Sequence, residues 1–325
     1  MRAARFLGNE RIEIDDLPEP KPAPGEVLLE VAYCGLCGSD KRPYRDGFDL
    51  IPGHEVSGTV VDANGTDVAV GTRAVAYLNV FCGECRYCRR GLTNLCPNRR
   101  GLLGWTAPWH GGYAEYMAVP AIDVLPVDAA IGLDAAVLLL DTIGTAWHGL
   151  RLAQAGEASR ALVIGCGPLG LGAVAGLRAF GVGEVFASDL VEARLLAAAE
   201  LGAHPVRPDE VAGLEDLEVV VEAVGTPATI MQAIRAVEPG GRVVMLGEVW
   251  RPWSFEPSQE TMLKDYSLIR SWYFPIREYA ENQQMLLEGK ADPRLLISHT
   301  FPLERLDEAF RLFLSGQTRK VLAAG

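Results

Sequence analysis

The pattern of apolar and polar positions divides the chain into two kinds of sequence. From Ala3 to about Pro120, short apolar or alternating runs are broken repeatedly by Gly and Pro. Such frequent interruption predicts the strands of a small, partly closed β domain. The clearest of these runs are residues 4–7, 11–14, 27–34, 56–63, 73–78 and 114–120.

From about Asp134 the apolar runs alternate with helical stretches. Strands are predicted at residues 161–165, 184–189, 217–225 and 242–247, with helices such as 191–201 and 229–237 between them. Strands separated by helices imply βαβ units and therefore a parallel sheet. A last amphipathic helix, ended by Gly316, is predicted from apolar residues at helical spacing: Leu303, Leu306, Phe310 and Phe313.

Composition and charge exclude several classes of protein. Apolar types make up 49% of the 325 residues and charged types 22%, as in globular proteins, which excludes a disordered or fibrous chain and allows about two domains. The 30 basic and 42 acidic residues give a net charge of −12. An acidic surface repels a phosphate backbone, so nucleic acid is not expected as a partner.

No membrane or export segment is expected either. The longest uncharged stretch, residues 161–177, has five glycines and a proline and is shorter than the roughly 20 residues of a membrane span. The N-terminal apolar run is too short for the core of a signal peptide. We therefore expect a cytoplasmic protein.

A glycine-rich turn predicts a dinucleotide site. The stretch Gly165-Cys166-Gly167-Pro168-Leu169-Gly170 follows an apolar strand and begins a helix that continues to about Phe180. In this context Gly165 makes a tight turn, Gly167 lets the backbone approach a pyrophosphate, and Gly170 allows close packing of helix and strand. The helix N-terminus then offers unpaired N–H groups to the phosphates.

An acidic residue at the end of the next strand bears on the choice of cofactor. Asp189 lies 19 residues after Gly170, near the spacing at which a carboxylate binds the ribose 2′-hydroxyl. It favours NAD, because a carboxylate repels the additional phosphate of NADP. Arg194 follows one helical turn later. The alternative is an ordinary glycine-rich turn followed by a helix-capping Asp.

Four of the seven cysteines form a dense cluster. Cys82, Cys85, Cys88 and Cys96 are separated by two, two and seven residues, a spacing that predicts one tetrahedral zinc within a single lobe. Four thiolates leave no position for substrate, so this zinc is expected to be structural. The alternative is a set of metal-free or redox-active cysteines.

Cys37 and His54 are candidates for a second, open metal site. One thiolate and one imidazole are good zinc ligands, but a catalytic site needs a third protein ligand and one open position. These residues alone leave other interpretations open. His54 is equally compatible with a buried structural histidine, and Cys34 with Cys37 is compatible with a zinc knuckle.

Taken together, the motifs resemble those of the medium-chain dehydrogenase/reductase family, specifically the zinc-dependent alcohol and polyol dehydrogenases. The resemblance covers nearly the whole chain. It rests on the CGLCGSD stretch, Gly53-His54-Glu55, the four-cysteine lobe, GGYAEY at 111–116, the GCGPLG turn with Asp189, and SHTFPLERLDEAF near the C-terminus. It implies an α/β fold in which residues 1–141 and 284–325 form a β-rich GroES-like catalytic domain. Residues 142–283 would form an inserted Rossmann NAD-binding domain with a doubly wound parallel sheet.

The resemblance also assigns metal ligands. Cys37 and His54 match the first two ligands of the catalytic zinc, and Asp141 falls where relatives carry Cys or Glu as the third. The alternative to a metal-binding role is that Asp141 only begins a helix. Glu55 matches an acid next to the metal that can approach it. Because an oxygen ligand is harder than sulfur, Asp141 predicts a more Lewis-acidic and more exchangeable zinc.

Other residues receive roles in proton transfer and positioning. Asp40 matches the acid that orients the zinc-binding histidine, and Ser39 matches the hydroxyl that binds the substrate oxygen. Arg42 stands where many alcohol dehydrogenases carry a proton-relaying His, and an arginine cannot relay a proton. Lys320 resembles a basic residue near the cofactor pyrophosphate, with a plain surface lysine as the alternative.

These observations predict a reversible oxidation of a secondary alcohol or polyol to a ketone, with NAD accepting hydride and two zinc ions per chain. Relatives commonly form dimers or tetramers, so a homodimer or homotetramer is expected. One alternative is an NADPH-dependent carbonyl reductase on the same scaffold. The other is a non-catalytic nucleotide- and zinc-binding regulator.

Overall fold

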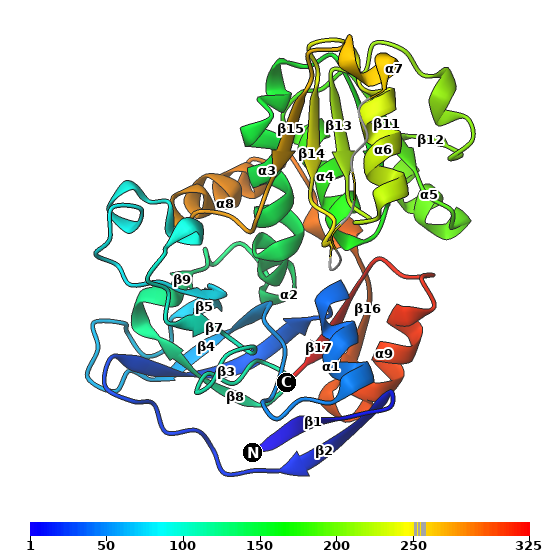
Figure 1. Cartoon of the computed structure of the whole chain (residues 1–325). Coiled ribbons are helices and arrows are strands. Elements are labelled where there is room, and N and C mark those ends of the chain that lie inside the picture. Colours follow the sequence, from blue (N-terminus) through cyan, green and yellow to red (C-terminus); the bar gives the residue numbers. More distant parts are fainter. Residues whose placement is uncertain (250–251, 253, 255–257) are drawn as a thin grey trace.

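The computed structural model describes residues 1–249, 252, 254 and 258–325. Figure 1 shows two bodies: a β-rich half that contains both chain termini, and a layered α/β half whose sheet stands above it. The chain passes from the first half to the second near residue 141 and returns after helix α8 (Tyr279–Leu287).

The β-rich half is built around β3 (Glu26–Gly35). This strand pairs in antiparallel fashion with β4 (Val56–Asp62), with β8 (Tyr116–Pro120) and with the C-terminal β17 (Lys320–Ala324). The sheet continues through β5 (Arg73–Ala76), β9 (Val124–Pro126) and β16 (Ile297–Pro302). A separate hairpin joins β1 (Arg2–Gly8) to β2 (Arg11–Asp16). The remaining elements of this half are α1 (Lys41–Asp46), β6 (Asn79–Val80), β7 (Gly101–Leu102), α2 (Leu133–Ala136) and α9 (Leu306–Leu314).

The second half is a parallel sheet covered by helices on both faces. Its strands are β10 (Arg160–Ile164), β11 (Glu184–Ser188), β12 (His204–Val206), β13 (Val219–Glu222), β14 (Arg242–Met245) and β15 (Ser267–Arg270). Among the described residues their order is β12-β11-β10-β13-β14-β15, the doubly wound order of dinucleotide-binding domains. The helices are α3 (Ala146–Leu152), α4 (Pro168–Ala179), α5 (Glu192–Glu200), α6 (Pro227–Ala236) and α7 (Gln259–Met262).

The predicted parallel sheet and β-rich half are confirmed, and so is the C-terminal helix. In α9 the apolar stripe is buried as its spacing requires: Leu306 and Phe310 are fully buried and Phe313 is nearly so. In the parallel sheet two strands were not predicted, β12 and β15. Both are short and lie at the edges of the sheet, where β15 is largely exposed and therefore carries no continuous apolar run. In the β-rich half the unpredicted strands are β6, β7, β9, β16 and β17.

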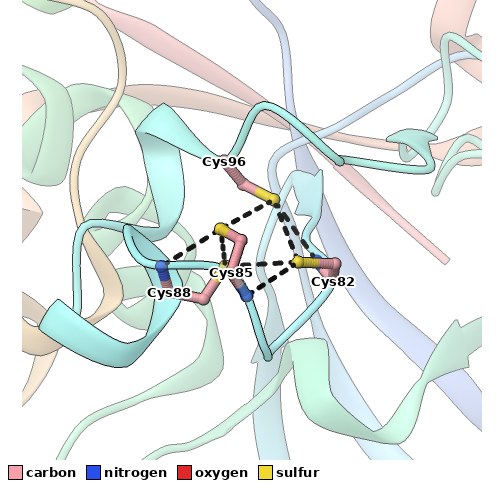
Figure 2. Close-up of side chains that lie close together, drawn as sticks. All are labelled: Cys82, Cys85, Cys88 and Cys96. Carbon is pink, nitrogen blue, oxygen red and sulfur yellow. Dashed lines mark hydrogen bonds between the residues drawn. The ribbon is translucent and has the colours of Figure 1, made fainter.

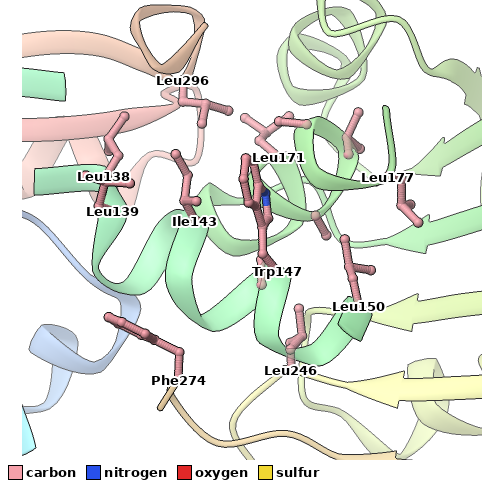
Figure 3. Close-up of a cluster of buried hydrophobic side chains, with 14 of the residues drawn as sticks. Leu138, Leu139, Ile143, Trp147, Leu150, Leu171, Leu177, Leu246, Phe274 and Leu296 are labelled. Atoms are coloured by element: carbon pink, nitrogen blue, oxygen red, sulfur yellow. The ribbon is translucent and has the colours of Figure 1, made fainter. Parts of the chain in front are cut away.

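A large apolar cluster fills the junction between the two halves. Figure 3 shows Trp147 of α3 at its centre, with Ile143 before it, Leu171 of α4 beside it and Phe274 opposite. Two glycines permit this packing. A Cβ on Gly172 would overlap the carbonyl oxygen of Thr142, and a Cβ on Gly144 would lie 2.5 Å from the Phe274 ring. The chain segment at 141–145 is thereby packed tightly between α4 and the segment that carries Phe274.

Among the described residues, no helix combines the length and the apolar composition needed to span a bilayer.

One buried acid weakens the β-rich half at neutral pH. Asp123 follows β8, is fully buried, and neither of its carboxylate oxygens has a hydrogen-bond partner among the described residues. Burial raises the pKa of Asp123 well above its usual range, and Arg100 only partly opposes this. The unfolded chain releases this proton near pH 4. The folded chain therefore binds more protons, and stability falls as the pH rises, by up to about 1.4 kcal/mol per pH unit.

We therefore predict that Asp123→Asn stabilises the protein at pH 7 and does so much less at pH 4.5, because asparagine has no charge to bury. Thermal unfolding of variant and wild type at both values measures the difference. Asp67→Asn, at an exposed acid, is the control and should change the melting temperature little. An equal change at both pH values for Asp123→Asn would contradict the explanation.

Candidate active site

Cys37 is positioned by the turn that follows β3. The chain leaves β3 at Gly35 and enters a 3₁₀ helix, Gly38–Asp40. The backbone N–H of Cys37 donates to Asp40 Oδ2 at 3.0 Å, which fixes the start of this helix. Gly35 is required because a Cβ there would lie 2.7 Å from Lys320 Cε.

His54 is positioned by the loop before β4. Gly53 has a left-handed backbone with φ of +98°, which favours glycine. A Cβ at this position would lie 2.7 Å from Cys34 Sγ and 3.0 Å from the Tyr113 ring. The Gly-His-Glu motif therefore needs its glycine to seat His54 against the strands behind it, where the imidazole is buried.

Asp141 comes from the junction between the two halves. It begins a π-helical turn, Asp141–Thr145, directly before α3. Such turns are uncommon and occur often at functional sites. Thr145 Oγ1 lies 3.3 Å from Asp141 Oδ1 and donates to it. The clamping of this turn by Gly144 and Gly172 fixes where the carboxylate points.

These segments meet at one point. Cys37 Sγ lies 3.7 Å and His54 Nε2 lies 3.3 Å from Asp141 Oδ2, and with Glu55 all four ligand atoms lie within 4.8 Å of one another. Zinc bonds of about 2.0–2.3 Å in a tetrahedron place ligand atoms roughly 3.3–3.8 Å apart. The donor set and its spacing therefore fit one zinc ion.

Glu55 is held by a buried ion pair. Its Oε1 contacts the ammonium of Lys320, and both side chains are almost completely buried. The interpretation of Lys320 as a surface residue is therefore wrong. Glu55 Oε2 has no hydrogen-bond partner among the described residues, which leaves one oxygen beside the cluster.

The electrostatics of the cluster favour a cation. Burial opposes charge on His54, but Asp40, Asp141 and Cys37 outweigh it and raise the pKa of His54 well above its usual range. For Glu55 the effect of burial is the opposite, because it raises the pKa to about 7 against the opposing charge of Lys320. Asp40 and Asp141 thus favour a positive charge at His54, as a divalent ion would supply.

Two side chains flank the cluster on the exposed side. Trp105 Nε1 lies 3.2 Å from His54 Nδ1, and Arg42 lies over the Trp105 ring at 5.6 Å from its centroid. Trp105 was not predicted as a site residue. Ser39 lies half-buried between Cys37 and Asp40 in the 3₁₀ helix.

Two loops flank the cluster. They are residues 42–52 and 101–110, which approach it through Arg42 and Trp105, whereas Trp250 and Trp253 lie outside the described residues. His110 Nδ1 accepts the backbone N–H of Ile51 and so ties these two loops together. His148 is buried in α3, where its Nδ1 lies 3.0 Å from Glu278 Oε1.

The glycine-rich turn has the geometry that its motif predicts. Gly165 has a φ of +91°, and a Cβ on Gly170 would overlap the Gly165 carbonyl. At Gly167, which caps α4, no described atom lies within 4 Å of an added Cβ. This is the open face that a pyrophosphate needs. Pro168 and Leu169 form the first turn of the helix.

Asp189 lies beside this turn. Its Oδ2 accepts the backbone N–H of Cys166 at 2.7 Å and its Oδ1 accepts that of Val191 at 2.9 Å. Arg194 lies closer to Asp189 than its sequence spacing suggested: its Nη1 is 3.5 Å from the Asp189 carboxylate. The end of the nucleotide site therefore contains one acid and one arginine.

The four cysteines of the lobe converge, as Figure 2 shows. Neighbouring sulfur atoms are 3.5 Å apart for Cys85 and Cys88, 3.6 Å for Cys82 and Cys96, and 3.9 Å for two further pairs. Four Zn–S bonds of about 2.3 Å in a tetrahedron place sulfurs roughly 3.8 Å apart. The lobe therefore fits a zinc ion with no open position.

Family models match both halves of the chain. The model of the alcohol dehydrogenase GroES-like domain matches residues 23–129, and the model of the zinc-binding dehydrogenase matches residues 168–288. The L-threonine 3-dehydrogenase of Symbiobacterium thermophilum is 30% identical, over 99% of this chain and 97% of that protein. The sorbitol dehydrogenase of Bacillus subtilis is 28% identical, over 95% and 92%.

Solved structures have the same fold. Alcohol dehydrogenase TADH from Thermus sp. ATN1 gives a TM-score of 0.91 at 29% identity, covering 100% of this chain and 99% of that one. An alcohol dehydrogenase from E. coli CFT073 complexed with NADH gives 0.89 at 28% identity, with the same coverage. A protein of Sinorhizobium meliloti 1021 described as a zinc-binding dehydrogenase and bound to NADP gives 0.86 at 26% identity, again with this coverage.

These matches confirm the predicted α/β fold, with a GroES-like domain and a Rossmann domain. The chain therefore belongs to the zinc-dependent alcohol and polyol dehydrogenases of the medium-chain dehydrogenase/reductase family, and it is an oxidoreductase.

Proposed function

We propose that this protein oxidises a secondary alcohol or polyol to a ketone with NAD as the hydride acceptor, using Cys37, His54 and Asp141 to hold a catalytic zinc. The observation that carries the proposal is the convergence of these three ligand atoms beside the nucleotide site. Thr142, which follows Asp141, touches α4 at Gly172, and the N-terminus of this helix faces the expected pyrophosphate. Three protein ligands leave one position for substrate.

When bound, zinc supplies a Lewis acid for the substrate oxygen and NAD supplies the hydride acceptor. The residues then have separate tasks. Cys37 thiolate, neutral His54 and Asp141 carboxylate carry a combined charge of −2, which balances a divalent ion. Asp40 orients His54, and Ser39 binds the substrate hydroxyl and receives its proton.

The proton that Ser39 receives from the substrate hydroxyl leaves the site without help from Arg42. The guanidinium of Arg42 cannot pass a proton onward as an imidazole does. Ser39 would therefore pass the proton to solvent or, when NAD is bound, to a hydroxyl of its ribose. The buried Glu55 is the second acceptor close to the metal ligands.

A second candidate function is suggested by Arg194. Asp189 favours NAD because its carboxylate repels an additional phosphate. Arg194, at 3.5 Å from that carboxylate, is a group that attracts the phosphate of NADP. An NADPH-dependent carbonyl reductase is therefore the alternative, and comparison of the two cofactors distinguishes them.

Removal of the Cys37 thiol is the first test of the mechanism. We predict that Cys37→Ser loses turnover by a factor of about 10³ or more, as expected for loss of metal-based activation. NAD binding, measured by calorimetry, should remain, because Cys37 lies outside the glycine-rich turn. Cys34→Ala changes a neighbouring thiol outside the cluster and should keep most of the activity. Full activity of Cys37→Ser would rule out the zinc mechanism.

Metal analysis tests both sites together. We expect close to two zinc ions per chain, of which one is lost to a mild chelator. The ion held by Asp141 should leave first, because a carboxylate is a harder and more exchangeable ligand than a fourth thiolate. The activity should fall in step with this first ion. Loss of the four-cysteine zinc before the other would contradict the assignment.

The cofactor assignment has its own test. We predict that the wild type prefers NAD and that Asp189→Ser shifts the ratio of kcat/KM towards NADP by about tenfold or more, which corresponds to roughly 1.4 kcal/mol. Arg194→Ala in that background should reverse much of the shift. A wild type that already prefers NADP would support the reductase alternative.

We further propose a cytoplasmic homodimer or homotetramer, in keeping with the acidic composition and the family. Light scattering on the purified protein measures its subunit number.

A further inference from the structure

Tyr113 is a buried residue of the GGYAEY motif that none of the assigned roles uses. Its hydroxyl donates to Asp40 Oδ2 at 2.7 Å, and its side chain is fully buried. The ring is stacked on Phe6 at 5.7 Å and meets Phe310 edge-on at 5.8 Å. Gly53 also lies against the ring. The phenol is thus held from several sides and has little freedom to turn.

Tyr113 fixes one oxygen of Asp40 and leaves the other directed at His54. Asp40 Oδ2 accepts both the Tyr113 hydroxyl and the backbone N–H of Cys37. Asp40 Oδ1 has no hydrogen-bond partner among the described residues and lies 3.5 Å from His54 Nδ1. Two donors on Oδ2 therefore prevent the carboxylate from rotating away from the imidazole.

His54 Nδ1 has a second neighbour that demands the opposite proton arrangement. Trp105 Nε1–H points at the same nitrogen from 3.2 Å. If Nδ1 carries the proton, it donates to Asp40 and Nε2 keeps its lone pair. If Nδ1 accepts from Trp105, the proton of a neutral imidazole is on Nε2. Only the first tautomer leaves Nε2, which faces Cys37 and Asp141, able to bind a metal.

We propose that Tyr113 is a positioning residue that acts through Asp40 to hold His54 in the tautomer with the proton on Nδ1, against the competing indole of Trp105. This inference rests on the proposed metal site. Its physical basis is that a carboxylate oxygen held in place is a stronger acceptor for the Nδ1 proton than one that is free to turn away. Burial keeps the Tyr113 hydroxyl protonated, because it raises the pKa of this residue well above its usual range.

The test is Tyr113→Phe, which removes only the hydroxyl. We expect the zinc held by Cys37, His54 and Asp141 to be lost to a chromogenic chelator about tenfold faster, the lower end of the effect of outer-shell changes on metal affinity. In cobalt-substituted protein, the visible spectrum of this site should change while that of the four-cysteine site stays constant. Both readouts are independent of turnover.

The matched control is Tyr44→Phe. Tyr44 is a buried phenol that packs on the same Phe310 ring, but its hydroxyl faces Asp307 instead of Asp40. This variant should change the melting temperature about as much as Tyr113→Phe while leaving zinc release unchanged. Equal zinc release from wild type and Tyr113→Phe would overturn the inference.

Trp105→Phe provides a rescue that a purely structural role does not predict. Removing the competing N–H from the Tyr113→Phe background should slow zinc release towards the wild-type rate. In Asp40→Asn protein, Tyr113→Phe should add little, because the residue through which it acts has changed. Release that stays fast without Trp105, or additive effects with Asp40→Asn, would contradict the tautomer mechanism.

Two outcomes separate this inference from the proposed function. A wild type that binds no zinc beyond the four-cysteine ion would refute the metal site itself. Normal zinc binding with no effect of Tyr113→Phe refutes only the role of Tyr113. If Tyr113→Phe fails to fold, the ¹³Cζ signals of labelled tyrosines in wild-type protein give the same information. One buried signal should shift on zinc removal, and its constancy would count against the inference.

Discussion

The close approach of α4 to the backbone that carries Asp141 is the constraint on which the metal cluster depends. Gly172 leaves room for the Thr142 carbonyl, and Gly144 leaves room for the Phe274 ring. With side chains at these positions the helix and the turn would have to separate. The same helix provides the phosphate-facing N-terminus at Gly167. One packing contact therefore sets both the position of Asp141 and its distance from the glycine-rich turn.

Charge balance explains why the ends of the chain meet at the cluster. Buried charges are costly unless they are paired. Lys320, from the C-terminal strand β17, neutralises Glu55, so the remaining ligands require only a divalent ion. Phe6 of β1 and Phe310 of α9 hold Tyr113, which holds Asp40. The two termini therefore stabilise the site electrostatically and by packing, although neither provides a ligand.

What could be predicted from the sequence depended on how far apart the partners lie along the chain. The glycine-rich turn and the four cysteines are local, so their spacing alone predicted geometry that the structure also has. Asp141 could be suggested as a metal ligand only from the family resemblance, because no motif in the neighbouring sequence indicates a ligand. Lys320 and Trp105 carry no local signal at all, since their roles come from contacts made across 265 and 51 residues. Edge strands such as β15 were missed for a different reason, because exposure removes the apolar pattern on which strand prediction depends.

The difference in locality also predicts different properties for the two proposed metal sites. The cysteines of the lobe lie within 15 residues, whereas Cys37 and Asp141 are separated by 104. Bringing Cys37 and Asp141 together costs roughly 2 kcal/mol more chain entropy than bringing the ends of the four-cysteine segment together. Burial of the core around Trp147 offsets this cost when the two halves fold. We therefore expect the ligands proposed for the catalytic zinc to be held in place by the core itself, so that this ion can leave without unfolding the junction. The lobe has three half-buried cysteines, which pack with the buried Cys96 against the edge of the same core. Because all four of its ligand candidates are cysteines of one short segment, we expect a zinc in the lobe to be a structural element and the zinc proposed at Cys37, His54 and Asp141 to be the exchangeable one.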